Sequence, residues 1–217
     1  MKSKARLFSL GILVLSIFIA GCISSGPSDY SKTQSTKAAT YEEKIPVKFE
    51  ACTLYTGEKL SAADLKAFNN PEVAYTVNYP SEWHYEIFLG TATFRPTEKK
   101  VPFAEIFTEG SWGVAYKGEN PTLETFTPFY INKKLVYDSG VDKLEESCTT
   151  TFLGQPAYKV VYNLYLDAEK PNVFTKSLGV WTVKNGEVYM LSYRADSRDF
   201  DANLPGVYAI LDSLQLK

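Results

Sequence analysis

The chain has 217 residues, of which 45% are hydrophobic and 22% charged, a composition typical of one or two globular domains. The formal net charge is −2 and the sequence pI is about 5.6, which argues against a basic surface for nucleic acid. Only one histidine is present, so neither histidine-based catalysis nor a zinc site built on several histidines is expected.

The first 22 residues have the pattern of an export signal. Three basic residues precede an apolar stretch that runs from 7 to 20. At about 1.5 Å per residue, this stretch would span roughly 21 Å, which is short of a bilayer core near 30 Å. The pattern therefore favours the apolar region of a secretory signal over a permanent anchor.

The apolar stretch ends in Ile19-Ala20-Gly21-Cys22, which resembles the lipobox of prokaryotic lipoproteins. The resemblance implies cleavage after residue 21 and attachment of lipid to the Cys22 thiol. Two or more acyl chains hold a protein stably on a membrane. We therefore predict a lipoprotein signal peptide over 1–21 and a protein anchored to the cell membrane, facing outside the cytoplasm. The alternatives are an ordinary signal peptide or an uncleaved anchor.

Residues 22–44 are predicted to form the lipidated N-terminus and a flexible tether, because Ser, Thr and Lys dominate and apolar periodicity is lacking. From 45 to 217 the sequence shows neither a second linker nor a repeat. About 170 residues are enough to bury one core. A single domain over 45–217 is therefore expected.

The domain is predicted to be rich in strands. Apolar residues alternate with polar or smaller ones over 73–79 and again over 158–166, which is typical of half-buried strands. Shorter strands are expected over 91–94 and 114–117. Asn185-Gly186 lies between two β-rich runs and predicts a hairpin. Its two-residue turn would pair residues across the hairpin. The expected pairs are Lys184 with Glu187 and Trp181 with Met190.

Two helices are expected before the long strands. Ser61 followed by Asp64 resembles a capping box and predicts a short helix to about Phe68. Residues 122–136 also fit a helix, in which Pro128 either introduces a kink or begins a shorter helix.

A third helix is predicted near the C-terminus. Apolar residues recur there on one helical face, and Pro205 suits a first turn, so the helix is expected to begin near Asn203. Residues 213–216 are expected to be extended. Antiparallel strands with helices on the faces of the sheet give an α+β sandwich.

Three short motifs resemble the PsbP-like family, the relatives of an extrinsic photosystem II subunit. Tyr79-Pro80-Ser81-Glu82-Trp83 resembles its "YPSxW" turn, Gly154-Gln155-Pro156-Ala157 is similar to its "G-x-P-A" strand start, and 208–214 looks like its C-terminal helix. The resemblance covers 79–217. It implies an antiparallel sheet between helical layers (α/β/α) and a non-catalytic binding role, often on a membrane surface. No ion-binding residue can be carried over.

Cys52 and Cys148 remain after lipidation of Cys22. Two cysteines in an exported domain are typical of a disulfide, which would close a loop of about 96 residues here. The alternative is a pair of buried free thiols. A redox-active pair is not expected, because the sequence contains no C-x-x-C motif.

Other reactive groups give no catalytic, metal or cofactor site. His84 follows the predicted turn near Ser81, but no G-x-S-x-G motif is present, so an exposed turn histidine is expected. Asp196, Asp199 and Asp201 form an acidic cluster before the last helix. Read as an EF-hand, the cluster lacks the required Gly at position 6 and Glu at position 12. Acidic residues near a helix start are favoured by the helix dipole, and this structural role is expected, with an irregular calcium site as the alternative.

The aromatic residues, 14% of the chain, belong mostly to the core, although some could line a ligand cleft. Trp83, Trp112 and Trp181 are the candidates for such a cleft. We therefore predict a surface lipoprotein, not an enzyme, held at the membrane by lipid on Cys22 and binding a membrane-protein partner or a small ligand. No cofactor and no nucleic-acid partner are expected. The alternatives are an enzyme acting on the cell envelope and a structural envelope component.

Overall fold

The computed structural model describes residues 45–217, except 89, 97–101, 109–119, 142 and 166–173. The predicted signal peptide, Cys22, the tether, the strand over 114–117 and Trp112 lie outside the described residues. Within the described part of the chain, no helix is both long enough and apolar enough to cross a membrane.

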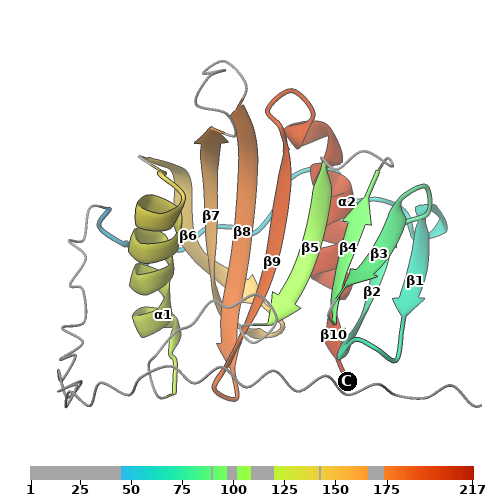
Figure 1. Ribbon diagram of the computed structural model, residues 1–217. Coiled ribbons are helices and arrows are strands. Elements are labelled where there is room, and N and C mark those ends of the chain that lie inside the picture. The colour runs from blue at the N-terminus through green and yellow to red at the C-terminus, as the bar shows by residue number, and fades with distance from the viewer. Residues whose placement is uncertain (1–44, 89, 97–101, 109–119, 142, 166–173) are drawn as a thin grey trace, which may run out of the picture. The chain divides into compact units, whose positions relative to one another are not determined.

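A seven-stranded antiparallel sheet forms the centre of the fold (Figure 1). The order of its strands is β3-β4-β5-β9-β8-β7-β6, so the long strands lie towards one end of the sheet. The strands are β3 (His84–Phe88), β4 (Thr91–Arg95), β5 (Phe103–Thr108), β6 (Leu144–Phe152), β7 (Gln155–Tyr165), β8 (Phe174–Lys184) and β9 (Glu187–Asp196).

The predicted hairpin joins β8 to β9. Both turn residues have positive φ, 56° at Asn185 and 79° at Gly186, as a two-residue turn of this kind requires. The expected register is confirmed: Lys184 lies opposite Glu187, and Trp181 lies opposite Met190. The strands predicted over 91–94 and 158–166 correspond to β4 and β7.

A small second sheet corrects one prediction. It contains β1 (Leu65–Asn69), β2 (Tyr75–Pro80) and β10 (Gln215–Leu216) in the order β1-β2-β10. The helix expected to extend to Phe68 is wrong: only a 3-10 turn, η1 (Ala62–Asp64), forms before β1. The Ser61 hydroxyl donates to the Asp64 carboxylate and caps no backbone N–H. Pairing with β2 buries Phe68 opposite Val77, which outweighs the local helix signal.

Helix α2 (Phe200–Ser213) and the small sheet cover one face of the large sheet. The helix begins three residues before the expected Asn203, so Pro205 lies inside it. At Gly206 an added Cβ would lie 2.7 Å from Pro80 and 2.8 Å from Trp83. The Tyr79–Trp83 turn therefore packs directly against the helix, and this close approach requires glycine.

Helix α1 (Leu123–Phe129) and the π-helix η3 (Tyr130–Asp138), which continues it, cover the other face. Thr122 caps α1 through a capping box with Thr125, so Pro128 lies inside the helix and does not begin it. Trp181 is fully buried, and its Nε1 donates to the Thr127 hydroxyl at 3.0 Å. The expected α+β architecture, an antiparallel sheet between helical layers, is confirmed.

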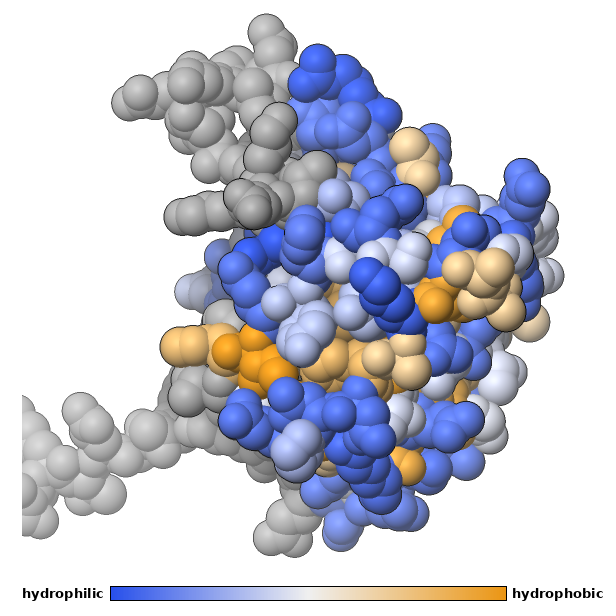
Figure 2. Space-filling model, turned by 90° about the vertical axis from the view of Figure 1, so that its right-hand side faces the viewer, coloured by the Kyte–Doolittle hydropathy of each residue, from blue (hydrophilic) through white to orange (hydrophobic). Residues whose placement is uncertain are grey.

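The outer strand β3 carries exposed apolar side chains. Tyr85 is 47% exposed and Phe88 is 65% exposed. Within the described residues, no strand pairs with the outer edge of β3. Figure 2 shows the side of the molecule where β1, β2 and β3 lie, with an apolar band between hydrophilic surfaces. The opposite edge strand, β6, is covered by the N-terminal segment of the domain.

Candidate functional site

The first described residues, 45–60, form a strap that wraps around the β6 edge of the sheet (Figure 1). The strap begins on the face covered by α1 and η3. The Ile45 N–H donates to Asn132 Oδ1 at 2.9 Å, and Asn132 Nδ2 donates to the Ile45 carbonyl at 3.1 Å. The Tyr158 hydroxyl then donates to the Lys48 carbonyl at 2.8 Å. One side chain on η3 thus fixes the start of the strap.

At the β6 edge the strap is held by backbone pairing and by a covalent bond. Ala51 pairs with Thr149 in a parallel bridge, flanked by two backbone hydrogen bonds of 2.7 and 2.8 Å. Cys52 and Cys148 form a disulfide with an S–S distance of 2.02 Å. The cysteine pair expected from the sequence is therefore a disulfide in the structure, and it joins the strap to β6.

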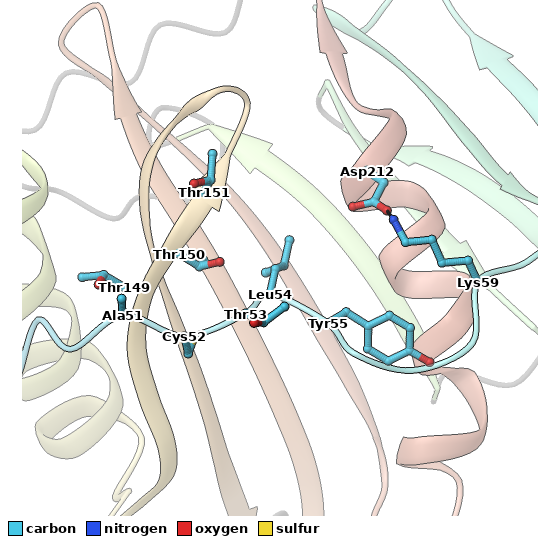
Figure 3. A pocket seen from close by; sticks show the side chains of 10 residues that line it. All are labelled: Ala51, Cys52, Thr53, Leu54, Tyr55, Lys59, Thr149, Thr150, Thr151 and Asp212. Atoms are coloured by element: carbon cyan, nitrogen blue, oxygen red, sulfur yellow. Dashed lines mark hydrogen bonds and ion pairs between the residues drawn. The ribbon is translucent and has the colours of Figure 1, made fainter.

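Beyond β6 the strap crosses to α2 on the opposite face of the sheet (Figure 3). The ring of Tyr55 stacks on the ring of Tyr208, with centroids 4.1 Å apart and an interplanar angle of 14°. Lys59 Nζ lies 2.5 Å from Asp212 Oδ2 near the end of the helix. The strap therefore spans the space between β6 and α2.

Two hollows, of about 520 and 590 Å³, lie along this part of the strap. They share Thr53, Leu54 and Tyr55, and together we call them the strap groove. The first hollow is lined by Ala51, Cys52, Thr53, Leu54, Tyr55, Lys59, Thr149, Thr150, Thr151 and Asp212. The second is lined by Thr53, Leu54, Tyr55, Thr56, Glu145, Glu146, Lys159, Val161, Lys176, Leu178, Phe200, Asp201, Leu204 and Tyr208. Hollows of this size are typical of small-molecule sites.

The three lysines that line the strap groove are each paired with a carboxylate, Lys59 with Asp212 as described above. Lys159, which is only 6% exposed, lies 2.8 Å from Glu146. Lys176 lies 3.0 Å from Glu145 and 5.0 Å from the ring centroid of Phe200. The hydrogen bond from Lys176 lowers the pKa of Glu145 below its ordinary value. The groove therefore has aromatic and aliphatic side chains in its walls, together with lysines that are each held by a carboxylate partner.

Cys52, Cys148 and Glu146 deserve a test as a metal site, because their ligand atoms lie within 4.8 Å of one another. Both sulfur atoms belong to the disulfide, however, and thiolates are the form of cysteine that binds metal. Glu146 is also paired with Lys159. In the disulfide form this cluster does not have the donor set of a metal site.

The other residues singled out in the sequence do not converge on one site. His84 is exposed at the start of β3, and it does not line the strap groove. Asp196 is paired with Arg198 at 3.0 Å, and this hydrogen bond lowers the Asp196 pKa to about 2. Of the acidic cluster, only Asp201 lines the groove. Trp83 and Trp181 are both buried in the core.

Sequence reasoning missed the two groove lysines that lie on strands of the large sheet. Lys159 alternates with Ala157 and Val161 on the buried face of β7, and Lys176 alternates with Leu178 on β8. A lysine at an inward position of an alternating strand was the available signal. The glutamates that pair with them come from β6, which was not predicted as a strand.

No protein-family model matches the sequence, and no curated protein matches it. The structure does match solved structures. The cyanobacterial PsbP protein CyanoP of Synechocystis sp. PCC 6803 has 14% identity and a TM-score of 0.49, covering 76% of this chain and 99% of its own. The structure is similar to that of a PsbP protein.

Two further matches have other descriptions. LpqN of Mycobacterium tuberculosis, described as involved in cell envelope biogenesis, has 10% identity and a TM-score of 0.47, covering 74% of this chain and 99% of its own. The Ran-binding protein Mog1p of Saccharomyces cerevisiae has 10% identity and a TM-score of 0.45, covering 70% and 95%.

Proposed function

We propose that this chain is a lipid-anchored surface protein whose domain binds a small amphipathic ligand in the strap groove, without catalysis. The observation that carries the proposal is the lining of the larger hollow. Leu54, Leu204 and Phe200 offer apolar surface, while Lys159 and Lys176 lie beside their carboxylate partners. A ligand with an apolar part and a polar part matches both kinds of surface.

The groove chemistry favours binding over turnover. A general acid or base needs a group that can exchange a proton with the substrate. The buried Lys159 is instead engaged by Glu146, and Lys176 by Glu145. Both cysteines of the groove region are joined in the disulfide. These groups serve as fixed polar contacts.

The membrane anchor supplies the mechanism of such a binding protein. A lipid on Cys22 would confine the domain to the membrane surface and raise its effective concentration for ligands and partners there. We expect Cys22→Ala to move the protein from the membrane fraction to the soluble fraction, and Ser25→Ala to leave it on the membrane. Retention of the Cys22→Ala protein on membranes washed with high salt would overturn the anchor.

Ligand binding is tested with the full-length protein, extracted gently from its own membranes so that a bound ligand stays in place. Native mass spectrometry is expected to show the lipidated mass plus one stoichiometric ligand mass. The variant Leu54→Asn, which changes a side chain shared by both hollows, is expected to lose this extra mass. A matched control is Leu153→Asn, because Leu153 is also partly buried but lies in the turn between β6 and β7.

The outcome separates the candidate functions. A ligand that stays with Leu153→Asn and leaves Leu54→Asn supports the strap groove. A ligand that stays with both variants places the site elsewhere. Conversion of the ligand to a product by the purified protein would replace the binding function by an enzymatic one.

A further inference from the structure

A third hollow, of about 530 Å³, lies on the opposite face of the sheet from the strap groove. It is bounded by η3 on one side and by the strands β4, β5, β9 and β7. It is lined by Thr93, Arg95, Phe103, Glu105, Tyr130, Lys134, Leu135, Asp138, Ser139, Tyr162, Leu164, Ser192 and Arg194. Two arginines on separate strands distinguish this hollow from the strap groove, and we call it the arginine groove.

Arg194 lies on β9 at the centre of the sheet. In the strand register it is opposite Phe103 of β5 and opposite Ser177 of β8. Its guanidinium carbon lies 5.9 Å from the centroid of the Phe103 ring. Its Nε is buried and has no hydrogen-bond partner among the described residues. No ion pair joins Arg194 to a carboxylate in this part of the chain.

Arg95 of β4 also lines the hollow with a buried Nε, but unlike Arg194 it has an ion-pair partner. Its Nη1 forms an ion pair with Glu86 of β3, so one end of the guanidinium is fixed. Its Nε, like that of Arg194, is buried and unpaired within the described residues. Buried donors without acceptors are uncommon and costly in folded proteins. Two such donors at one hollow therefore indicate a site for acceptor oxygens.

The acidic groups of the hollow leave these donors available. Glu105 accepts a hydrogen bond from the Thr93 hydroxyl at 3.3 Å, and no described hydrogen bond or ion pair joins it to either arginine. Burial raises the pKa of Glu105, and the Thr93 hydrogen bond and the two arginines lower it. Asp138 is paired with Lys133 at 2.8 Å and Lys134 at 3.2 Å.

We propose that the arginine groove binds a phosphate group through Arg194 and Arg95. The planar guanidinium presents several N–H donors in a geometry that fits phosphate oxygens, and such charge-assisted hydrogen bonds are stronger than neutral ones. Arg194, which has no ion-pair partner among the described residues, supplies positive charge to the hollow. The Phe103 ring below it holds the guanidinium in place. The phosphate can belong to a soluble compound or to a lipid headgroup.

The first test observes the arginine donors directly in the full chain carrying Cys22→Ala. Arginine Nε–H signals are recorded by ¹H–¹⁵N NMR while inorganic phosphate is added. The signals of Arg194 and Arg95 are expected to shift in a saturable way, and that of the exposed Arg198 is expected to stay in place. Equal movement of all three signals, or none, would overturn the proposal.

The second test uses variants and calorimetry. Arg194→Gln and Arg95→Gln are each expected to weaken phosphate binding by about tenfold or more. The matched control Arg198→Gln is expected to bind like the wild type. An equal loss in all three variants would show general charge attraction and overturn the site. Acetate that binds as tightly as phosphate would assign the hollow to carboxylates instead.

A third arm identifies the source of the phosphate group. The same protein is sedimented with vesicles of phosphatidylcholine alone or mixed equally with phosphatidylglycerol, in the presence and absence of free phosphate. Binding to the anionic vesicles that Arg194→Gln weakens and free phosphate displaces assigns a lipid headgroup. Saturable binding of free phosphate without vesicle binding assigns a soluble compound. Failure in both media overturns the arginine groove and leaves the strap groove unaffected, because the two hollows share no residue.

Discussion

The two faces of the large sheet use the same strands to build opposite electrostatic environments. On the strap face, Lys159 and Lys176 are each neutralised by a glutamate of β6. On the face covered by α1 and η3, which we call the helix face, Arg194 has no ion pair among the described residues, and its Nε is unpaired. Alternation of side chains along β7, β8 and β9 sends neighbouring residues to different faces. The comparison shows that one sheet can carry lysines in ion pairs on one face and an arginine without an ion pair on the other.

The layers that cover the two faces differ as well. The largest expected effect on stability tests the layer formed by α1 and η3. Trp181 is fully buried under α1 and donates to Thr127. We expect Trp181→Ala to lower the free energy of unfolding by about 3–5 kcal/mol, because it leaves a cavity and an unpaired hydroxyl. Urea unfolding measures the loss. Trp181→Phe should cost clearly less, and an equal cost would show that the hydrogen bond outweighs packing.

The strap layer is tested next through its covalent bond. The disulfide closes a loop with a sequence separation of 96 between Cys52 and Cys148. Replacing both cysteines by serine is expected to lower the free energy of unfolding by about 2–4 kcal/mol, because the unfolded chain regains conformational freedom. Unfolding of the wild type with and without reductant is the matched measurement. A double variant unaffected in stability would show that the strap is held by its non-covalent contacts.

The contact between η3 and the start of the strap is expected to contribute less to stability. Asn132 on η3 exchanges two hydrogen bonds with the backbone of Ile45 and is only 2% exposed. We expect Asn132→Ala to cost about 1–3 kcal/mol, because it leaves the strap's first N–H and carbonyl without these partners. Hydrogen exchange at the Ile45 amide should quicken at the same time. The exposed Asn69 provides the control, since Asn69→Ala should change neither quantity.

The smallest expected effect concerns pH and the helix face. Burial raises the pKa of Glu105, so the folded chain holds this proton more tightly than the unfolded chain does. Ionised Glu105 therefore opposes folding at neutral pH, and this cost disappears as pH falls through the ordinary range of glutamate. We expect Glu105→Gln to be slightly more stable than the wild type at pH 7, with the difference shrinking towards pH 4. A stability difference that is the same at pH 4 and at pH 7 would contradict this prediction.

Much of the sheet could be predicted because its signals are local. Alternation marked β2 and β7, and Asn185-Gly186 fixed the register of β8 on β9. The helix expected to reach Phe68 failed because pairing with β2, a contact between segments, decides that backbone. The disulfide could be predicted because only two cysteines remain in a domain that is expected to be exported. The strap around β6 was not, because nothing in residues 45–60 indicates which edge they cover.

The two grooves lay further from the reach of sequence reasoning. Arg95 and Arg194 are about one hundred positions apart, and they line the same hollow because their strands, β4 and β9, both pair with β5. The pairing of Lys159 with Glu146 likewise depends on the register of β6 on β7. Strand order, which single-sequence patterns do not specify, creates both sites.

The position of the disulfide along the strap has a mechanical consequence. If the chain is anchored at its N-terminus, a pull from the membrane travels along the strap towards β6. Residues 45–51 can peel away from η3 and from the edge of β6, but Cys52 transfers the load to Cys148 in the middle of β6. The strap beyond this bond, which includes Tyr55, therefore bears less of the tension than residues 45–51 do. The strap groove can therefore keep its shape while the protein is under force.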